Sequence, residues 1–123
     1  MVHVYNHTKL VFKGYVLFID AVNITSHTLV QPYENHTEKN SLTRECIAKG
    51  FPKPITITWL LNSLPVTRHD ITFSVLDEVD YVIVTSSIRI NSVDKDDRGV
   101  FECFARNSVG NDSESTNFNV KCK

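Results

Sequence analysis

The segment Asp97-Arg98-Gly99-Val100-Phe101-Glu102-Cys103 decides the fold of this chain. It passes from a turn mixture of Asp, Arg and Gly into the run Val100 to Arg106, which is rich in residues that favour strands. Successive side chains of a strand point to opposite faces of a sheet, so half of this run should face a core and half should face away from it. The predicted inward residues are Phe101, Cys103 and Ala105, and the predicted outward residues are Glu102, Phe104 and Arg106.

The rest of the chain carries similar short stretches of Val, Ile, Thr, Tyr and Phe, separated by turn residues. None of its windows has the apolar spacing of a convincing amphipathic helix. Strands are predicted at Ser41 to Ala48, Ile55 to Leu61, Ile71 to Leu76, Tyr81 to Ile90, Val100 to Arg106 and Ser115 to Lys121. The further inward positions are Ile55, Ile57, Trp59, Leu61, Val82, Val84, Ile88, Ile90, Phe118 and Val120. Short strands at this spacing predict an all-β domain, either a sandwich or a barrel.

Cys46, Trp59 and Cys103 follow one another in the order Cys, Trp, Cys. The chain resembles the immunoglobulin superfamily, specifically its I-set, over roughly residues 24 to 121. The resemblance also rests on Gly50-Phe51-Pro52-Lys53-Pro54, Ser87-Ile88-Arg89-Ile90-Asn91-Ser92-Val93 and Ala105-Arg106-Asn107-Ser108-Val109-Gly110. It implies a two-sheet antiparallel Greek-key sandwich with a Cys46–Cys103 disulfide. The Trp59 indole would cover this bond, and Phe101 would lie beside it in the core.

Two positions depart from the family pattern. The family usually has a Tyr two residues before the second Cys, and its hydroxyl bonds to upstream backbone; Phe101 stands there instead, so that hydrogen bond should be absent. Arg44 lies two residues before Cys46, where the alternation points inward. A buried guanidinium without a partner is costly, so we expect Arg44 to pair with a carboxylate, to reach solvent past the sheet end, or to be turned outward by a bulge.

Residues 1–23 have no clear period and are predicted to be an N-terminal extension, a linker or an extra strand, followed by an immunoglobulin-like domain at residues 24–123. The apolar stretch from Tyr15 to Ile19 is far shorter than the roughly 20 residues that span a bilayer, and it lacks the cleavage site of a signal peptide. The chain is therefore expected to be a domain of a longer protein, with no membrane insertion by this fragment.

Asn-x-Ser/Thr acceptor sequences begin at Asn6, Asn23, Asn35 and Asn111, and none has Pro in the middle. We expect these asparagines to lie in loops and to carry glycans, the alternative being that they are ordinary polar loop residues. Together with a disulfide, they predict an extracellular protein, at the cell surface or secreted. The remaining cysteine, Cys122, is predicted to be a free thiol or to pair outside this fragment.

The composition argues against nucleic-acid binding, because the 13 Lys and Arg residues are balanced by 14 Asp and Glu residues and no run of basic residues occurs. No metal or cofactor site is expected, since the histidines are scattered and lack ligand spacing; they are His3, His7, His27, His36 and His69. Catalysis is not expected either, since nucleophile elbows and phosphate loops are missing. Asp94, Asp96 and Asp97 could collect Ca²⁺, but Lys95 and Arg98 interleave with them and favour a solvated turn.

Leu60, Phe104 and Arg106 are the candidate partner-binding residues, because Leu60 and Phe104 should point outward on neighbouring strands of the family's C-F-G sheet. Scattered exposed apolar residues are also normal, so coincidence is the alternative. The predicted function is non-enzymatic recognition or adhesion in a receptor, adhesion molecule or matrix protein. Its partner would be a protein, homophilic or heterophilic, beside neighbouring domains of the same chain. The alternatives are an intracellular muscle-filament domain and an ectodomain module of a receptor tyrosine kinase.

Overall fold

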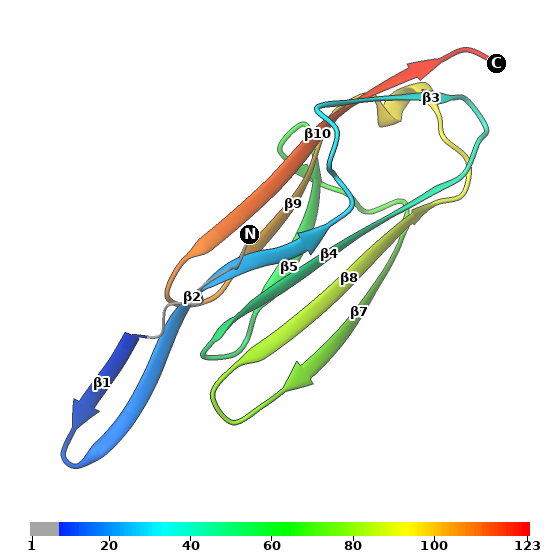
Figure 1. Cartoon of the computed structure of the whole chain (residues 1–123). Helices are drawn as coiled ribbons and strands as arrows, with labels where there is room; N and C mark the ends of the chain where they lie inside the picture. Colours follow the sequence, from blue (N-terminus) through cyan, green and yellow to red (C-terminus); the bar gives the residue numbers. More distant parts are fainter. Residues whose placement is uncertain (1–7) are drawn as a thin grey trace.

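The computed structural model describes residues 8–123, and in it two five-stranded sheets face each other (Figure 1). The first sheet has the order β1 (Thr8–Phe12), β2 (Tyr15–His27), β4 (Leu42–Phe51), β8 (Val82–Ile90), β7 (Asp70–Asp77). The second has the order β3 (Tyr33–Thr37), β10 (Asn111–Lys121), β9 (Gly99–Arg106), β5 (Thr56–Leu61), β6 (Leu64–Pro65). A single 3₁₀ turn, η1 (Lys95–Asp97), precedes β9 within this described part. The prediction of an all-β two-sheet sandwich is confirmed.

Every predicted strand forms, with ends shifted by a few residues, and β10 shows the largest shift. It begins at Asn111 instead of Ser115, because Asn111 pairs with Arg106 directly after the β9–β10 turn. Strands β3 and β6 are not among the predicted strands. Strand β3 is polar and pairs in parallel with β10, and β6 has only two residues, so neither shows a run of alternating apolar side chains.

The core lies between the sheets and contains the predicted inward residues. Phe101, Cys103 and Ala105 of β9 are completely buried. Leu61 and Val120, at strand ends, are only partly buried and pack against this cluster. The Phe101 ring stacks on Phe118, with ring centroids 4.7 Å apart, so it fills the corner by aromatic packing.

Strand β2 is continuous across the predicted division between residues 23 and 24. Its first part pairs with β1 from Thr8↔Ile19 to Phe12↔Tyr15, and this hairpin extends beyond the other strands at one end of the sandwich (Figure 1). From Asp20 onward β2 pairs with β4. Val22 is buried in the common core.

Gly99 begins β9 with a φ of 127°, a conformation that side chains with a Cβ rarely adopt. A Cβ built there would lie 2.1 Å from Oδ1 of Asn62. Asn62 uses that oxygen to accept a hydrogen bond from the Val100 amide and uses Nδ2 to donate to the Arg98 carbonyl. The β5–β6 turn therefore fixes the position of the first residue of β9. The turn can come this close only because residue 99 is a glycine.

Candidate recognition surface

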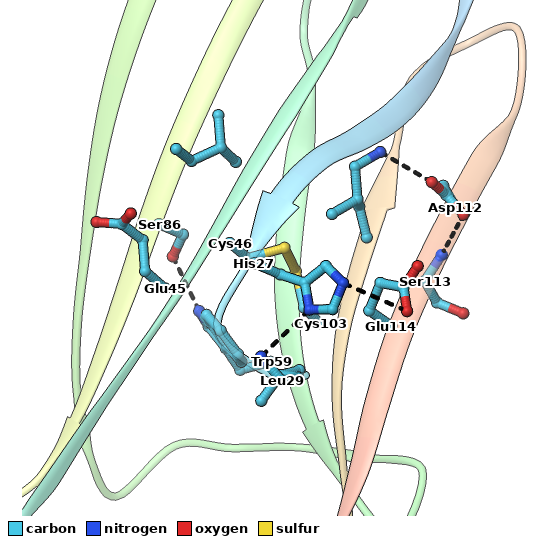
Figure 2. The surroundings of a disulfide bond; sticks show 12 residues. His27, Leu29, Glu45, Cys46, Trp59, Ser86, Cys103, Asp112, Ser113 and Glu114 are labelled. Atoms are coloured by element: carbon cyan, nitrogen blue, oxygen red, sulfur yellow. Dashed lines mark hydrogen bonds and ion pairs between the residues drawn. A yellow bond between two sulfur atoms is a disulfide. The ribbon is translucent and has the colours of Figure 1, made fainter. Parts of the chain in front are cut away.

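The predicted disulfide joins Cys46 of β4 to Cys103 of β9 and links the two sheets (Figure 2). The two Cα atoms are 6.6 Å apart, within the usual range for such a bond. Trp59, the cross-strand neighbour of Cys103, is buried beside it. The indole Nε1 donates to Oγ of Ser86 over 2.9 Å, and Ser86 donates in turn to the Thr72 carbonyl. This buried polar group is satisfied, so the site serves stability.

Arg44 takes the first of its three predicted arrangements and pairs with a carboxylate. Its guanidinium contacts both carboxylate oxygens of Glu34 on β3, and its NH1 group donates to the Thr43 carbonyl over 2.8 Å. His36 lies 3.1 Å from the same Glu34 side chain. Because Arg44 and Glu34 belong to different sheets, this pair holds the sheets together at the β3 end.

The prediction of a solvated turn before β9 is confirmed for Asp94 and Asp96, which are exposed, and is wrong for Asp97, which is completely buried. Its Oδ1 atom lies 2.5 Å from an Arg68 nitrogen and 2.7 Å from Nε2 of His69. Its Oδ2 atom accepts a hydrogen bond from the Asp94 amide. The prediction went wrong because Arg68 and His69 reach Asp97 from a distant loop.

Each described histidine faces a carboxylate. His27 lies 3.6 Å from Glu114, and His36 and His69 contact Glu34 and Asp97 as above. Between residues 8 and 123, no three His, Cys, Asp or Glu side chains gather closely enough to hold a metal ion. His3 and His7 lie outside the described residues.

The outward side of β5 and β9 holds the candidate surface. Thr56 pairs with Arg106 and Thr58 with Phe104, so these side chains form neighbouring rows on the face opposite the core. They line a shallow hollow of about 370 Å³. The complete lining is Pro54, Thr56, Thr58, Phe104, Arg106, Asn107 and Ser108. We call it the Phe104–Arg106 hollow.

Arg106 is the charged group of this hollow. It is exposed, and among the described residues it is the one arginine with neither a hydrogen-bond nor an ion-pair partner. Phe104 is half-buried beside it. Leu60 faces the same side but lies opposite Glu102 and outside the hollow lining. The structure therefore brings Phe104 and Arg106 together and leaves Leu60 at the margin.

Asn107 positions the end of β9, a role that the sequence analysis missed. It is buried, and its Nδ2 donates to the Asp20 carbonyl over 2.9 Å while its Oδ1 accepts from the Val22 and Gly110 amides. These bonds fix the β9–β10 turn against β2. The sequence shows that Asn107 begins an Asn-Ser-Val-Gly turn. It does not show that the partners of Asn107 are backbone groups of β2, more than 80 residues away.

The described acceptor asparagines lie in strands, which contradicts the prediction of loops. Asn23 lies in β2, Asn35 in β3 and Asn111 at the start of β10. Asn35 and Asn111 are exposed and Asn23 is half-buried. Strand β3 is an edge strand, and β2 and β10 are each next to an edge strand, so outward side chains on them still reach solvent. Asn6 lies outside the described residues.

Cys122 follows the end of β10 and is an exposed free thiol. The described chain contains no helix of the length and apolarity that a membrane crossing requires.

The sandwich, its inter-sheet disulfide and the buried indole together define an immunoglobulin-type domain. A family model described as "Immunoglobulin domain" matches residues 24–107, and the chain belongs to this family.

Curated relatives are similar over the same region. Cell adhesion molecule Dscam1 of Drosophila melanogaster is 33% identical over 78 residues, which cover 63% of this chain and 4% of that protein. Lachesin of Drosophila melanogaster is 35% identical over 85 residues, covering 69% of this chain and 21% of that protein. The chain thus corresponds to a small part of these relatives.

Solved structures support the fold. The Dscam1 Ig7 domain has a TM-score of 0.62 and 27% identity, covering 82% of this chain and 97% of that chain. A chimeric titin Z1Z2 has a TM-score of 0.59 at 16% identity, covering 83% of this chain and 96% of that chain, which shows likeness of fold alone.

Proposed function

We propose that this chain is a non-enzymatic recognition module from the extracellular part of an adhesion molecule or receptor. It is similar to Dscam1, which is described as a cell adhesion molecule, and to Lachesin. The inter-sheet disulfide and the four acceptor sequences fit an oxidising, glycosylating compartment. The module would act beside neighbouring domains of the same chain, since it corresponds to a small part of these relatives.

The Phe104–Arg106 hollow is the proposed protein-binding surface, and the unpaired Arg106 is the observation that carries this assignment. An exposed guanidinium beside a half-buried aromatic ring suits a partner that presents a carboxylate next to an apolar group. No acidic side chain lines the hollow, so Arg106 is available for such a pair. Leu60 would extend the contact at its margin.

Glycans on Asn6, Asn23, Asn35 and Asn111 form part of the proposal. Asn111 is directly opposite Arg106 in the β9–β10 register, so a glycan on Asn111 would stand beside the hollow. An occupied Asn111 would then reduce access to Arg106. Changing Asn111→Gln should in that case strengthen partner binding, and should leave it unchanged if Asn111 is bare.

Binding by the secreted chain tests the hollow. The chain, fused to an antibody Fc region and coated on beads, would be assayed for bead aggregation and for binding to a panel of adherent cells. We expect Phe104→Asp and Arg106→Glu each to remove the binding seen with the unchanged chain. Arg89→Glu is the matched control, because Arg89 is also exposed but lies on the other sheet. Full binding by both hollow variants, with native circular dichroism, would overturn the assignment.

The redox and glycan state tests the compartment. The longer native protein is expected to carry an oxidised Cys46–Cys103 pair and glycan mass on at least one acceptor asparagine. Mass spectrometry of tryptic peptides, with and without glycan removal, measures both. Reduced cysteines together with four bare asparagines would favour the intracellular filament alternative. A receptor tyrosine kinase would share the extracellular signature and differ only in the rest of the parent chain.

A further inference from the structure

Strand β7 is the open edge of its sheet. It pairs with β8 from Asp70↔Arg89 to Asp77↔Val82 without a bulge and is last in the strand order. No other strand between residues 8 and 123 pairs with its second edge. Outward N–H and C=O groups of such an edge can accept another strand.

Between Asp70 and Asp77, the β7 edge lacks the usual features that prevent strand addition. Its eight residues contain neither Lys nor Pro, whereas the edge strand β6 of the other sheet has only two residues, one of which is Pro65. Large apolar side chains are also exposed along β7: Phe73 is 58% exposed, Val75 63% and Leu76 50%. Phe73 and Val75 share one side of the strand, and Leu76 lies on the other. The pair of Phe73 and Val75 beside a free edge marks a surface that an added strand would cover.

An apolar groove continues from this edge. Phe73 and Val75 are opposite Ser86 and Val84 of β8, both of them buried, so they point toward the space between the sheets. Next to Val75 is a cavity of about 350 Å³. It is lined by Lys53, Pro54, Ile55, Val75, Val82 and Val84. Every second side chain of an added strand would lie over this groove.

The charges at the Asp77 end of β7 specify the occupant. Asp70 begins the strand, Asp77 ends it, and Glu78 and Asp80 follow. At the Asp77 end, Lys53 pairs with Asp77 over 2.7 Å, and Glu78 and Asp80 leave an acidic excess. At the other end Asp70 lies opposite Arg89 of β8, which balances its charge. A second copy aligned antiparallel with Phe73 against Val75 would also place Asp70 against Glu78 at both ends, and like charges oppose that pairing. The charges favour a basic partner strand instead.

The acceptor asparagines also leave this edge uncovered. Asn23, Asn35 and Asn111 lie on β2, β3 and β10, at the opposite ends of the two strand orders from β7 and β6. No acceptor sequence occurs in β5, β6, β7 or β8. The β7 edge is therefore free of attached glycan whichever of these residues is modified.

We propose that the β7 edge binds an extended segment of a partner protein, which adds to the sheet as an antiparallel or parallel strand. The segment would have apolar side chains at alternate positions, seated over the Val75 groove, and Lys or Arg at the end that meets Glu78 and Asp80. This edge belongs to the other sheet, and its groove shares one lining residue, Pro54, with the Phe104–Arg106 hollow.

The test uses the whole chain and two synthetic peptides. One is acetyl-Lys-Val-Thr-Val-Thr-Val-Lys-amide, and the other has the same core with Glu at both ends. We expect the Lys-ended peptide to bind at millimolar concentration or below, to slow hydrogen exchange of the β7 amides, and to bind more tightly than the Glu-ended peptide. No binding, or protection confined to β1 or β3, would overturn the proposal.

Two variants sharpen the test. Val75→Asn removes the apolar contact at the groove without adding a charge, and should weaken binding of the Lys-ended peptide at least about tenfold. Val11→Asn on β1 should leave the affinity of that peptide unchanged. Val11 is a fair control because it is 68% exposed on another edge strand. Glu78→Lys should reduce or reverse the difference in affinity between the Lys-ended and the Glu-ended peptide, without altering the groove. A Val75-dependent dimer in analytical ultracentrifugation, with no peptide binding, would show that a second copy is the occupant.

Discussion

The two faces of β9 are built from the same eight residues and serve different purposes. On the inner face, Phe101 and Cys103 are completely buried among Trp59, Phe118 and the disulfide partner. On the outer face, Phe104 is half-buried and Arg106 is exposed without a partner. A shift of one residue along this strand therefore separates groups that hold the fold from groups that we propose for partner binding. Substitutions at adjacent positions of β9 should therefore act on different properties, one on stability and the other on binding.

The largest effect is expected from removing the disulfide on the inner face. Cys46→Ala with Cys103→Ala opens a loop with a sequence separation of 57 residues. On the chain-entropy model this should lower the free energy of unfolding by about 4 kcal/mol. Urea unfolding followed by circular dichroism measures the loss. Cys122→Ala, which removes the exposed free thiol, is the control and should leave stability unchanged.

The next largest effect is expected at Asp97, the buried carboxylate at the entrance to β9. Asp97→Ala leaves His69 and the Asp94 amide without their acceptor and should cost about 3 kcal/mol. Arg68 contributes less, because its side chain is 45% exposed and can turn to water. The exposed neighbour Asp96→Ala should change stability by less than about 0.5 kcal/mol. Equal thermal midpoints for the two variants would contradict the buried network.

A smaller effect is expected from Ser86, which accepts the indole N–H of Trp59. Ser86→Ala keeps the packing but leaves that buried donor unsatisfied, at a cost of about 2 kcal/mol. Ser87→Ala, one position along on the outward side of β8, removes a hydroxyl from a half-buried position and should cost far less. The difference between the urea midpoints of the two variants measures the contribution of the Trp59–Ser86 hydrogen bond to stability. Equal midpoints would mean that a water molecule accepts the indole N–H in place of the serine hydroxyl.

The smallest effect on stability is expected on the outer face of β9. Arg106→Ala should change the free energy of unfolding by less than about 0.5 kcal/mol, because Arg106 has no partner among the described residues. The same variant should lose partner binding. A clear loss of stability would show that the outer face also supports the fold. The two faces would then not differ in their contribution to stability.

The amino-acid sequence alone determined the class of fold and the inner face of the main strands. Alternation is a local property, so Phe101, Cys103 and Ala105 could be assigned to the core from neighbouring residues. The order of Cys46, Trp59 and Cys103 resembles that of the immunoglobulin family, and this resemblance predicted the disulfide.

Only the tertiary structure decided which distant groups meet. Glu34 reaches Arg44, Arg68 and His69 reach Asp97, and Asn107 binds the backbone of β2. It also decided that Leu60 lies at the margin of the hollow that Phe104 and Arg106 share. These contacts depend on how two sheets pack and on the register of their strands, and local periodicity carries no information about either.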